Sequence, residues 1–513
     1  MGASTRRALV LVGAAAVVAA LTALVFLVRA GGDPADAATW PITWELRSSD
    51  NGPLFQFLHD VVAGRALDWS FSPQVFVFPE LPISAIAFAV TGGSIYGYYL
   101  VVAMLNNALL FVVLVGLSRV LFPGGSAVLR AAIATTPLLV LPLIGTSWIL
   151  SFHLAPTYYF GMYAALLAAP LLVLSTSRAA TITIGVALAL TAASNPLALL
   201  FAAPATAVTL LVVALRHGAR AVRRPVVIVA GTLLLALVLR LVFSPLQGTS
   251  PFTYVDPEVF ATRLSQIGPY FAFEARDLAA AAILTTGLVL AVVCLATAIV
   301  AAVLYARGRT SSLAVVYLGL IPLGGVAATF ALMITHYLYF WPVLILPFVL
   351  VLLAVPRGAV PVAAASAALV LFAVGLATGA ANFGTVDRYF GYRTPETVCL
   401  DEFVPGQLGY ATFSDSRRLS LTSATGMRLI QIESSLEPSH WLTNRAYPTG
   451  EAGTFFYVND HGDERPVDAL AIESRFGEPD GVVACDDGQS LLIYGDPAKL
   501  DLIAEFYGVA PKL

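Results

Sequence analysis

Eleven long apolar runs constrain this chain more than any other feature of its sequence. A helix needs about 20 mainly apolar residues to cross the hydrocarbon core of a bilayer, and each run has roughly that length. They cover residues 8–28, 96–117, 129–150, 158–175, 179–193, 197–215, 225–243, 279–304, 313–333, 338–355 and 359–379. With 58% hydrophobic and 12% charged residues, the composition excludes an ordinary soluble protein. The sequence therefore predicts an α-helical polytopic membrane protein with about 11 transmembrane helices.

Arginine and carboxylate residues lie on opposite sides of the predicted spans. Arg6, Arg7 and the loops that share their side carry no Asp or Glu, and their arginines are Arg119, Arg178, Arg216, Arg220, Arg223, Arg224, Arg307, Arg309 and Arg357. Because positive charge marks the cytoplasmic side, we expect a cytoplasmic N-terminus and an extracytoplasmic C-terminus. The multispan domain would cover residues 1–380, with outer loops at 29–95 and 244–278. Two lysines in a chain rich in Ala and Val indicate a bacterial protein of the inner (plasma) membrane.

Residues 381–513 differ in character, because acidic residues outnumber basic ones two to one and no run is long enough to span. Short β-like runs occur at Gly409–Phe413, Met427–Ile432, Thr454–Val458, Gly481–Ala484 and Ser490–Tyr494, with helical stretches at Val467–Arg475 and Leu500–Tyr507. This pattern predicts a small extracytoplasmic α/β domain. It would serve as a cap or acceptor-binding module. Its only two cysteines, Cys399 and Cys485, are expected to form a disulfide, which an extracytoplasmic compartment permits.

The first outer loop concentrates carboxylates and tryptophans at the edge of the membrane domain. The carboxylates are Asp50, Asp60, Asp68 and Glu80, and Trp40, Trp44 and Trp69 lie near them in the sequence. The remaining Asp and Glu residues of the first 386 positions lie in the same two outer loops. Carboxylates confined to one side of a bilayer indicate chemistry at that face.

Three segments of this loop and one later segment carry a family resemblance. The loop reads Asp50-Asn51-Gly52-Pro53-Leu54-Phe55, then Val62-Ala63-Gly64-Arg65, then Phe78-Pro79-Glu80-Leu81-Pro82, and a late outer edge reads Thr335-His336-Tyr337-Leu338-Tyr339-Phe340-Trp341-Pro342. An early acid, a short helix ending at glycine, a proline motif and an aromatic entry to a late span resemble the GT-C glycosyltransferases, such as mannosyl- and arabinosyltransferases. The resemblance implies sugar transfer from a polyprenyl-phosphate donor to a cell-envelope glycan, lipid or protein.

Such a transfer needs a base to take the proton of the acceptor hydroxyl. Asp50 is the candidate base, and its alternative role is to cap the helix that follows it. Glu80 is either a second acid or metal ligand, or a plain loop carboxylate. Asp60 and Asp68 are expected to be solvated residues of a helix face and a turn.

On the donor side the chemistry calls for groups that bind a phosphate. His336 and Tyr337 are candidates, although aromatic residues are expected at this interface anyway. The others are His153 at an outer turn, Arg240 near the outer end of its span and Arg263 in the second outer loop. Arg240 could equally extend its side chain to the interface.

Two other classes of function stay open. A transporter or lipid flippase would also be polytopic, but ion-coupled carriers usually hold ionisable groups within the membrane, and the predicted spans contain no Asp, Glu or Lys. A noncatalytic envelope-assembly protein would use its outer domain to bind partners. No motif indicates a metal site. Whether the protein uses a divalent metal as a cofactor therefore stays open. The arginines are spread over the loops, which argues against nucleic acid and leaves membrane lipids as expected partners.

Overall fold

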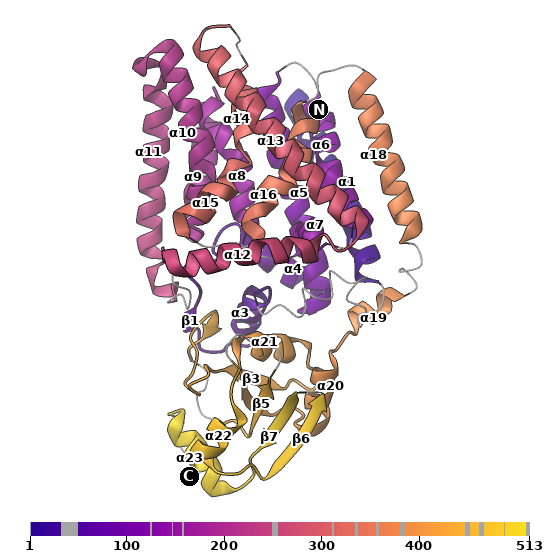
Figure 1. Cartoon of the computed structure of the whole chain (residues 1–513), viewed down its shortest axis with the longest axis vertical. Coiled ribbons are helices and arrows are strands. Elements are labelled where there is room, and N and C mark those ends of the chain that lie inside the picture. Colours follow the sequence, from indigo (N-terminus) through magenta and orange to yellow (C-terminus); the bar gives the residue numbers. More distant parts are fainter. Residues whose placement is uncertain are drawn as a thin grey trace.

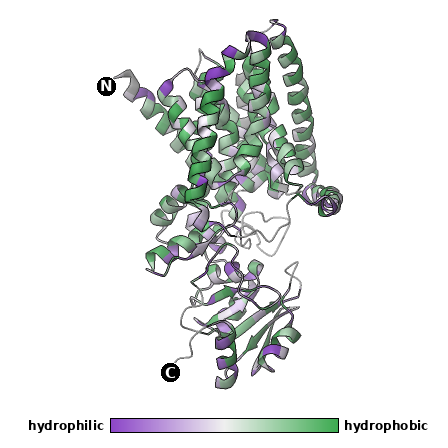
Figure 2. Ribbon diagram, turned by 90° about the vertical axis from the view of Figure 1, so that its left-hand side faces the viewer, coloured by the Kyte–Doolittle hydropathy of each residue, from purple (hydrophilic) through white to green (hydrophobic). Residues whose placement is uncertain are grey.

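The structure is a computed structural model of the chain. It describes residues 2–31, 50–123, 126–145, 147–155, 159–248, 255–309, 312–333, 337–354, 359–379, 385–446, 452–460, 466–486 and 488–508. A bundle of apolar helices makes up its larger part, and a smaller α/β region lies at one end of that bundle (Figure 1). Colouring by hydropathy shows the same division, because the bundle is almost uniformly apolar and the smaller region is mixed (Figure 2).

The bundle is built from helices that coincide with the apolar runs of the sequence. Among the described residues, six are long and apolar enough to cross a membrane: α1 (Ala3–Ala30), α5 (Ile95–Leu121), α6 (Ala127–Ile144), α10 (Leu197–His217), α11 (Ala219–Val242) and α13 (Leu278–Ala306). Helices α14 (Leu313–Leu320) and α15 (Leu323–Leu332) form a seventh candidate if this bent pair is counted as one span. Shorter apolar helices in the described residues include α4 (Glu80–Thr91), α8 (Phe160–Leu174), α9 (Arg178–Ser194), α17 (Leu346–Ala354) and α18 (Ala359–Thr378).

Three predicted spans are broken in the structure. The run 313–333 bends by 46° where Pro322 begins α15, because proline cannot continue the hydrogen-bond ladder of the preceding helix. The run 338–355 is divided into a 3₁₀ turn η3 (Tyr337–Phe340), α16 (Trp341–Leu344) and α17, with Pro342 and Pro347 at the starts of the two helices. The run 129–150 ends at Ile144, and α7 (Trp148–Ser151) and η1 (Phe152–Leu154) follow it.

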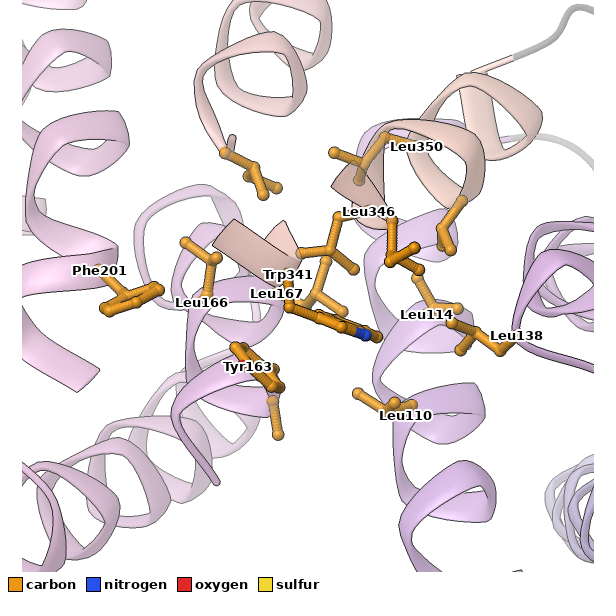
Figure 3. Packing of buried hydrophobic residues seen from close by; sticks show 14 of the residues in the cluster. Leu110, Leu114, Leu138, Tyr163, Leu166, Leu167, Phe201, Trp341, Leu346 and Leu350 are labelled. Carbon is orange, nitrogen blue, oxygen red and sulfur yellow. The ribbon is translucent and has the colours of Figure 1, made fainter. Parts of the chain in front are cut away.

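The centre of the bundle is packed around Trp341, whose side chain has no exposed surface. Its ring stacks on Tyr163 with 4.5 Å between the ring centroids. Leucines from four helices surround the pair: Leu110 and Leu114 of α5, Leu138 of α6, Leu167 of α8 and Leu346 of α17 (Figure 3). The broken segment 337–354 places Trp341 in this core. Its side chain therefore fills the interior of the bundle at the point where the helix is interrupted.

Helix α12 (Pro257–Glu274) lies across the end of the bundle that faces the α/β region, and the turned view looks along its axis (Figures 1 and 2). Asp256 caps its start by accepting hydrogen bonds from the backbone of Glu258 and Val259. At its other end Glu274 accepts hydrogen bonds from the Ser147 hydroxyl at 2.6 Å and the Trp148 amide at 2.9 Å. These contacts fix the second outer loop to the bundle.

The C-terminal region folds around a five-stranded sheet of order β3-β2-β5-β7-β6. Its strands are β2 (Leu408–Ala411), β3 (Arg428–Gln431), β5 (Phe455–Asn459), β6 (Gly481–Asp486) and β7 (Gln489–Ile493). Strand β2 runs parallel to β3 and β5, whereas β7 is antiparallel to β5 and β6. The helices are α19 (Val386–Phe390), α20 (Pro395–Phe403), α21 (Phe413–Thr422), α22 (Ala469–Phe476) and α23 (Pro497–Phe506). Cys399 of α20 is bonded to Cys485 of β6.

Residues 50–80, which lie between α1 and α5, are joined to this region by a second, smaller sheet. Strand β1 (Trp69–Ser70) pairs antiparallel with β4 (Thr443–Asn444). The second outer loop adds to the contact at Phe71, whose carbonyl accepts a hydrogen bond from the Gly248 amide at 2.6 Å. A Cβ on Gly248 would lie 2.2 Å from that oxygen, so only glycine fits there. We call the contact between residues 50–80 and residues 385–508 the junction.

Candidate functional site

Asp50 is half-buried and lies just before helix α3 (Pro53–Val62). Pro53 occupies the first turn of that helix, where a missing N–H costs nothing. The N-cap residue is Gly52, and no side chain caps the helix. The interpretation of Asp50 as a helix cap is therefore wrong. Burial raises the pKa of the Asp50 carboxyl, and the nearby Arg417 guanidinium opposes that rise.

Arg417, on α21, is the cation that faces Asp50, and its side chain is only 3% exposed. Its Nε donates a hydrogen bond to the Gln56 side chain of α3 at 3.2 Å, and its Nη2 donates to the Leu442 carbonyl. Burial lowers the pKa of Arg417 to about 10, and Asp50 acts against that change. The guanidinium thus ties the start of α3 to the C-terminal region. Sequence reasoning missed this residue, because an arginine next to Arg418 on a polar helix carries no signal of burial.

Asp60, on the last turns of α3, is fully buried. Its carboxylate accepts hydrogen bonds from Arg65 at 3.0 Å, the Trp69 indole at 3.1 Å and the Asn444 amide at 3.1 Å. The expectation of a solvated residue is therefore wrong. The burial of Asp60 could not be predicted from the sequence, because Asn444 comes from β4 and meets Asp60 only through the tertiary fold. Asp68 is exposed, as expected, and pairs with Arg445 at 2.6 Å.

Glu80 is the first residue of helix α4 (Glu80–Thr91) and is 7% exposed. Its Oε1 accepts a hydrogen bond from the Gly161 amide, near the start of α8, at 2.9 Å. A Cβ at position 161 would lie 2.6 Å from that oxygen, so glycine allows the close approach. Burial raises the pKa of Glu80 to about 7, against the effect of two backbone hydrogen bonds. Its Oε2 is buried without a hydrogen-bond partner in the described part of the chain.

Asp50 and Glu80 therefore face different partners. Asp50 faces Arg417 of the C-terminal region, whereas Glu80 binds the start of α8 within the bundle. Both carboxylates lie outside the candidate membrane spans, and burial raises the pKa of both. Glu80, whose pKa is raised to about 7, can therefore exchange a proton near neutral pH, which is the property required of a general acid or base. Burial shifts the pKa of Asp50 in the same direction.

A pocket of about 310 Å³ opens at the junction, and neither Asp50 nor Arg417 is among the residues that line it. One wall is α3 with Gln56 and His59, and the other is β3 with Arg428 and Gln431. Gln56 also accepts the hydrogen bond from Arg417, so the pair and the pocket share this side chain. A volume of this size is at the lower end of the range of about 300–1,000 Å³ found for small-molecule sites.

The donor-side candidates are not gathered around this pocket. His153 lies in the core, with its Nε2 2.6 Å from the Leu138 carbonyl oxygen and its ring 6.1 Å from that of Trp341. Arg240, at the end of α11, donates a hydrogen bond to the Ala193 carbonyl at 3.1 Å. Arg263 is half-buried on α12. Tyr337 begins η3, but its side chain, like the whole of His336, lies outside the described residues.

In the described part of the chain no three His, Cys, Asp or Glu side chains gather in a way that could hold a metal ion. The candidate site thus consists of Asp50 with Arg417, of Glu80 at the start of α8, and of the separate pocket at the junction. No protein-family model, no curated protein and no solved structure matches this chain.

Proposed function

We propose that the protein is a membrane glycosyltransferase that moves a sugar from a polyprenyl-phosphate donor to an acceptor of the cell envelope. The observation that carries this proposal is Asp50, a half-buried residue that faces Arg417 of the C-terminal region and whose carboxyl pKa is raised by burial. Asp50 keeps some exposed surface, whereas Glu80 is almost fully enclosed. Asp50 is therefore the proposed base, and Glu80 is the second carboxylate to test.

In the proposed reaction the acceptor hydroxyl oxygen attacks the anomeric carbon of the sugar. A bond forms between these two atoms, the bond from the anomeric carbon to the phosphate oxygen breaks, and polyprenyl phosphate leaves with the electron pair. Asp50 takes the hydroxyl proton, which contributes about 10²–10⁴-fold to the rate in typical general-base catalysis. Arg417, which faces Asp50, acts against the rise that burial causes in the pKa of that carboxyl and so favours its ionised form, which a base requires.

The proposal includes a topology of eleven spans with the C-terminal region outside the cytoplasm. Arginines at the end of α10, at the start of α11 and after α13 lie at the same end of the bundle as the N-terminus (Figure 1). The α/β region and the outer loops lie at the opposite end. The excess of arginine at one end supports a cytoplasmic location for that end in a bacterial inner membrane. Reporter fusions after Arg224 and after residue 508 should then report opposite sides, and a cytoplasmic C-terminus would contradict this topology.

A noncatalytic envelope-assembly protein is the second candidate, and the Asp50–Arg417 pair itself favours it. A buried arginine on one segment that faces a carboxylate on another can have a purely structural role, which is to hold the two segments together. In that case neutralising Asp50 would loosen the junction and change no reaction. A transporter or flippase has no comparable observation in its favour.

Asp50→Asn separates the two candidates, because asparagine keeps the size of the side chain and removes its basicity. The full chain in lipid nanodiscs would be given radiolabelled polyprenyl-phosphate mannose or arabinose with envelope extract as acceptor. We expect a loss of transfer of about 10²–10⁴-fold with unchanged insertion and melting temperature. Asp68→Asn is the matched control, since Asp68 lies in the same loop but is exposed and paired with Arg445. Wild-type transfer by a folded Asp50→Asn protein would exclude Asp50 as the base.

A further inference from the structure

The pocket at the junction is lined by basic side chains and by no carboxylate. Its titratable residues are His59 of α3, Arg65 after that helix, Arg428 of β3 and His440 before β4. Arg65 is neutralised by Asp60 at 3.0 Å. The side chains of His59, Arg428 and His440 have no hydrogen-bond or ion-pair partner in the part of the chain that the structure describes. The pocket therefore presents three cationic or cation-forming groups that the fold itself does not use.

A buried acceptor lies in the same wall. Gln431 is 4% exposed, and its Nε2 donates a hydrogen bond to the Ser439 hydroxyl at 2.7 Å. Its Oε1 is buried without a partner among the described residues, a situation that costs about 1–3 kcal/mol unless a ligand or water donates to the oxygen. An anion cannot satisfy this oxygen, but a hydroxyl group can. The pocket thus calls for a ligand that carries both negative charge and hydroxyl groups.

We propose that this pocket binds a phosphate-bearing saccharide, with Arg428, His59 and His440 at the phosphate and Gln431 at a sugar hydroxyl. Arginine suits a phosphate because its planar guanidinium can donate two parallel hydrogen bonds. The volume of about 310 Å³ lies at the lower end of the range of small-molecule sites, which suits a small phosphorylated sugar. The strand position supports the assignment, because β3 is an edge strand of the sheet and lines the pocket with four consecutive residues from Arg428 to Gln431.

The further role of this ligand as the sugar acceptor rests on the proposed glycosyltransferase function. Gln56 links the pocket to Arg417, and Arg417 faces Asp50. A saccharide held in the pocket would therefore lie against Gln56, the side chain that is hydrogen-bonded to the arginine facing the proposed base. The binding of a phosphorylated saccharide does not depend on that role and can be measured without any transfer reaction.

The test is a calorimetric titration of the full chain in nanodiscs of neutral lipid with glucose 6-phosphate. Glucose, inorganic phosphate and glucuronate are the comparison ligands, and vesicles of phosphatidylglycerol test a lipid headgroup as the source of the phosphate. We expect glucose 6-phosphate to bind at least tenfold more tightly than glucose or inorganic phosphate. Binding that is equal for glucose and glucose 6-phosphate, or strongest for glucuronate or for phosphatidylglycerol, would overturn the assignment.

Variants locate the site. Arg428→Gln should weaken glucose 6-phosphate binding about tenfold or more, because one charge-assisted hydrogen bond is worth about 1.5–3 kcal/mol. His440→Asn, at an exposed position, should weaken it less and cannot disturb the core. Arg445→Gln is the matched control, because Arg445 lies near the pocket in sequence but pairs with Asp68 and does not line it. Unchanged affinity in both pocket variants would contradict the proposal.

The two proposals fail separately. If Asp50→Asn binds glucose 6-phosphate like the wild type but transfers no sugar, both proposals stand. If the wild type transfers sugar but binds no glucose 6-phosphate, the pocket assignment is wrong and the glycosyltransferase function remains. If it binds glucose 6-phosphate but transfers nothing, the pocket assignment remains and the catalytic proposal is wrong.

Discussion

The interior of the bundle and the junction hold the protein together by different means. Around Trp341 the bundle core consists of stacked rings and leucines from several helices. The junction has an apolar cluster of its own, in which Trp69 and Phe71 pack with Leu442, but it adds buried charged groups, above all Asp60 and Arg417, that join segments far apart in the sequence. Packing spreads its stabilisation over many contacts, whereas these buried polar groups concentrate theirs in a few. Damage to the junction should therefore affect the candidate site and leave the bundle intact.

The largest effect should come from removing the centre of the bundle core. Trp341→Ala deletes a fully buried side chain that stacks on Tyr163, and such a change costs about 3–5 kcal/mol. We expect a large fall in the melting temperature of the whole chain in detergent. Tyr305→Ala, near the end of α13 and outside this core, is a control with a smaller effect. A Trp341→Ala protein with wild-type melting would show that the bundle does not depend on this core.

Loss of the disulfide should weaken the C-terminal region alone. The bond closes a loop with a sequence separation of 86, and Cys399→Ser should cost that region about 2–4 kcal/mol. We expect faster proteolysis and hydrogen exchange in residues 385–508, with little change in the helices. Cys294→Ser is the control, because Cys294 is unbonded. Free alkylation of both Cys399 and Cys485 in denatured, unreduced protein would contradict the bond.

Asp60→Ala should open the junction itself. The change leaves Arg65, the Trp69 indole and Asn444 without their shared acceptor, at a cost of about 2–3 kcal/mol. Hydrogen exchange at β1 and β4 should rise while the core around Trp341 keeps its protection. Equal exchange in the variant and the wild type would mean that other contacts carry the junction.

The buried carboxyl of Glu80 should make the stability of the protein depend on pH. The folded chain holds its proton up to about pH 7, whereas the unfolded carboxyl releases it near its ordinary value of 4.5. The native state then binds more protons between these values, so stability falls as pH rises from about 4.5 to 7. Glu80→Gln has no such proton to release, so its stability should not fall over this pH range. At pH 8 its melting temperature should exceed that of the wild type, by the equivalent of about 1–3 kcal/mol in the free energy of unfolding. At pH 4.5 it should not. The control Glu258→Gln, on exposed α12 surface, should show no such difference.

The smallest effect is expected at the exposed edge of the junction. Asp68 and Arg445 form an ion pair in which both side chains are more than a third exposed, and exposed pairs contribute about 0–1 kcal/mol. Asp68→Ala should leave the melting temperature almost unchanged, with less effect still at high salt. A loss as large as that of Asp60→Ala would remove the distinction between the buried and the exposed parts of the junction.

The sequence predicted the elements better than their contacts. Apolar runs of span length and short β-like runs marked helices and strands, because hydrophobic periodicity is a local property. The breaks at Pro322 and Pro342 were missed, since a long apolar run hides a proline at the start of a new helix. The setting of Asp50 was also out of reach, because Arg417 meets it only through the packing of α21 on α3. Asp60 was misread for the same reason, since its acceptor role depends on Asn444.

The pairing of β1 with β4 has a consequence for the order in which the protein is made. Asp68 and Asn444, which are hydrogen-bonded beside this pairing, are 376 positions apart, so nearly the whole chain is synthesised before the first outer loop meets its partner. Until then the loop lacks one wall of the pocket and the arginine that faces Asp50. A chain that stops early, or whose final segment remains on the wrong side of the membrane, would insert its helices and still lack the site. Completion of the site thus reports that the last segment has been delivered to the same side as the first loop.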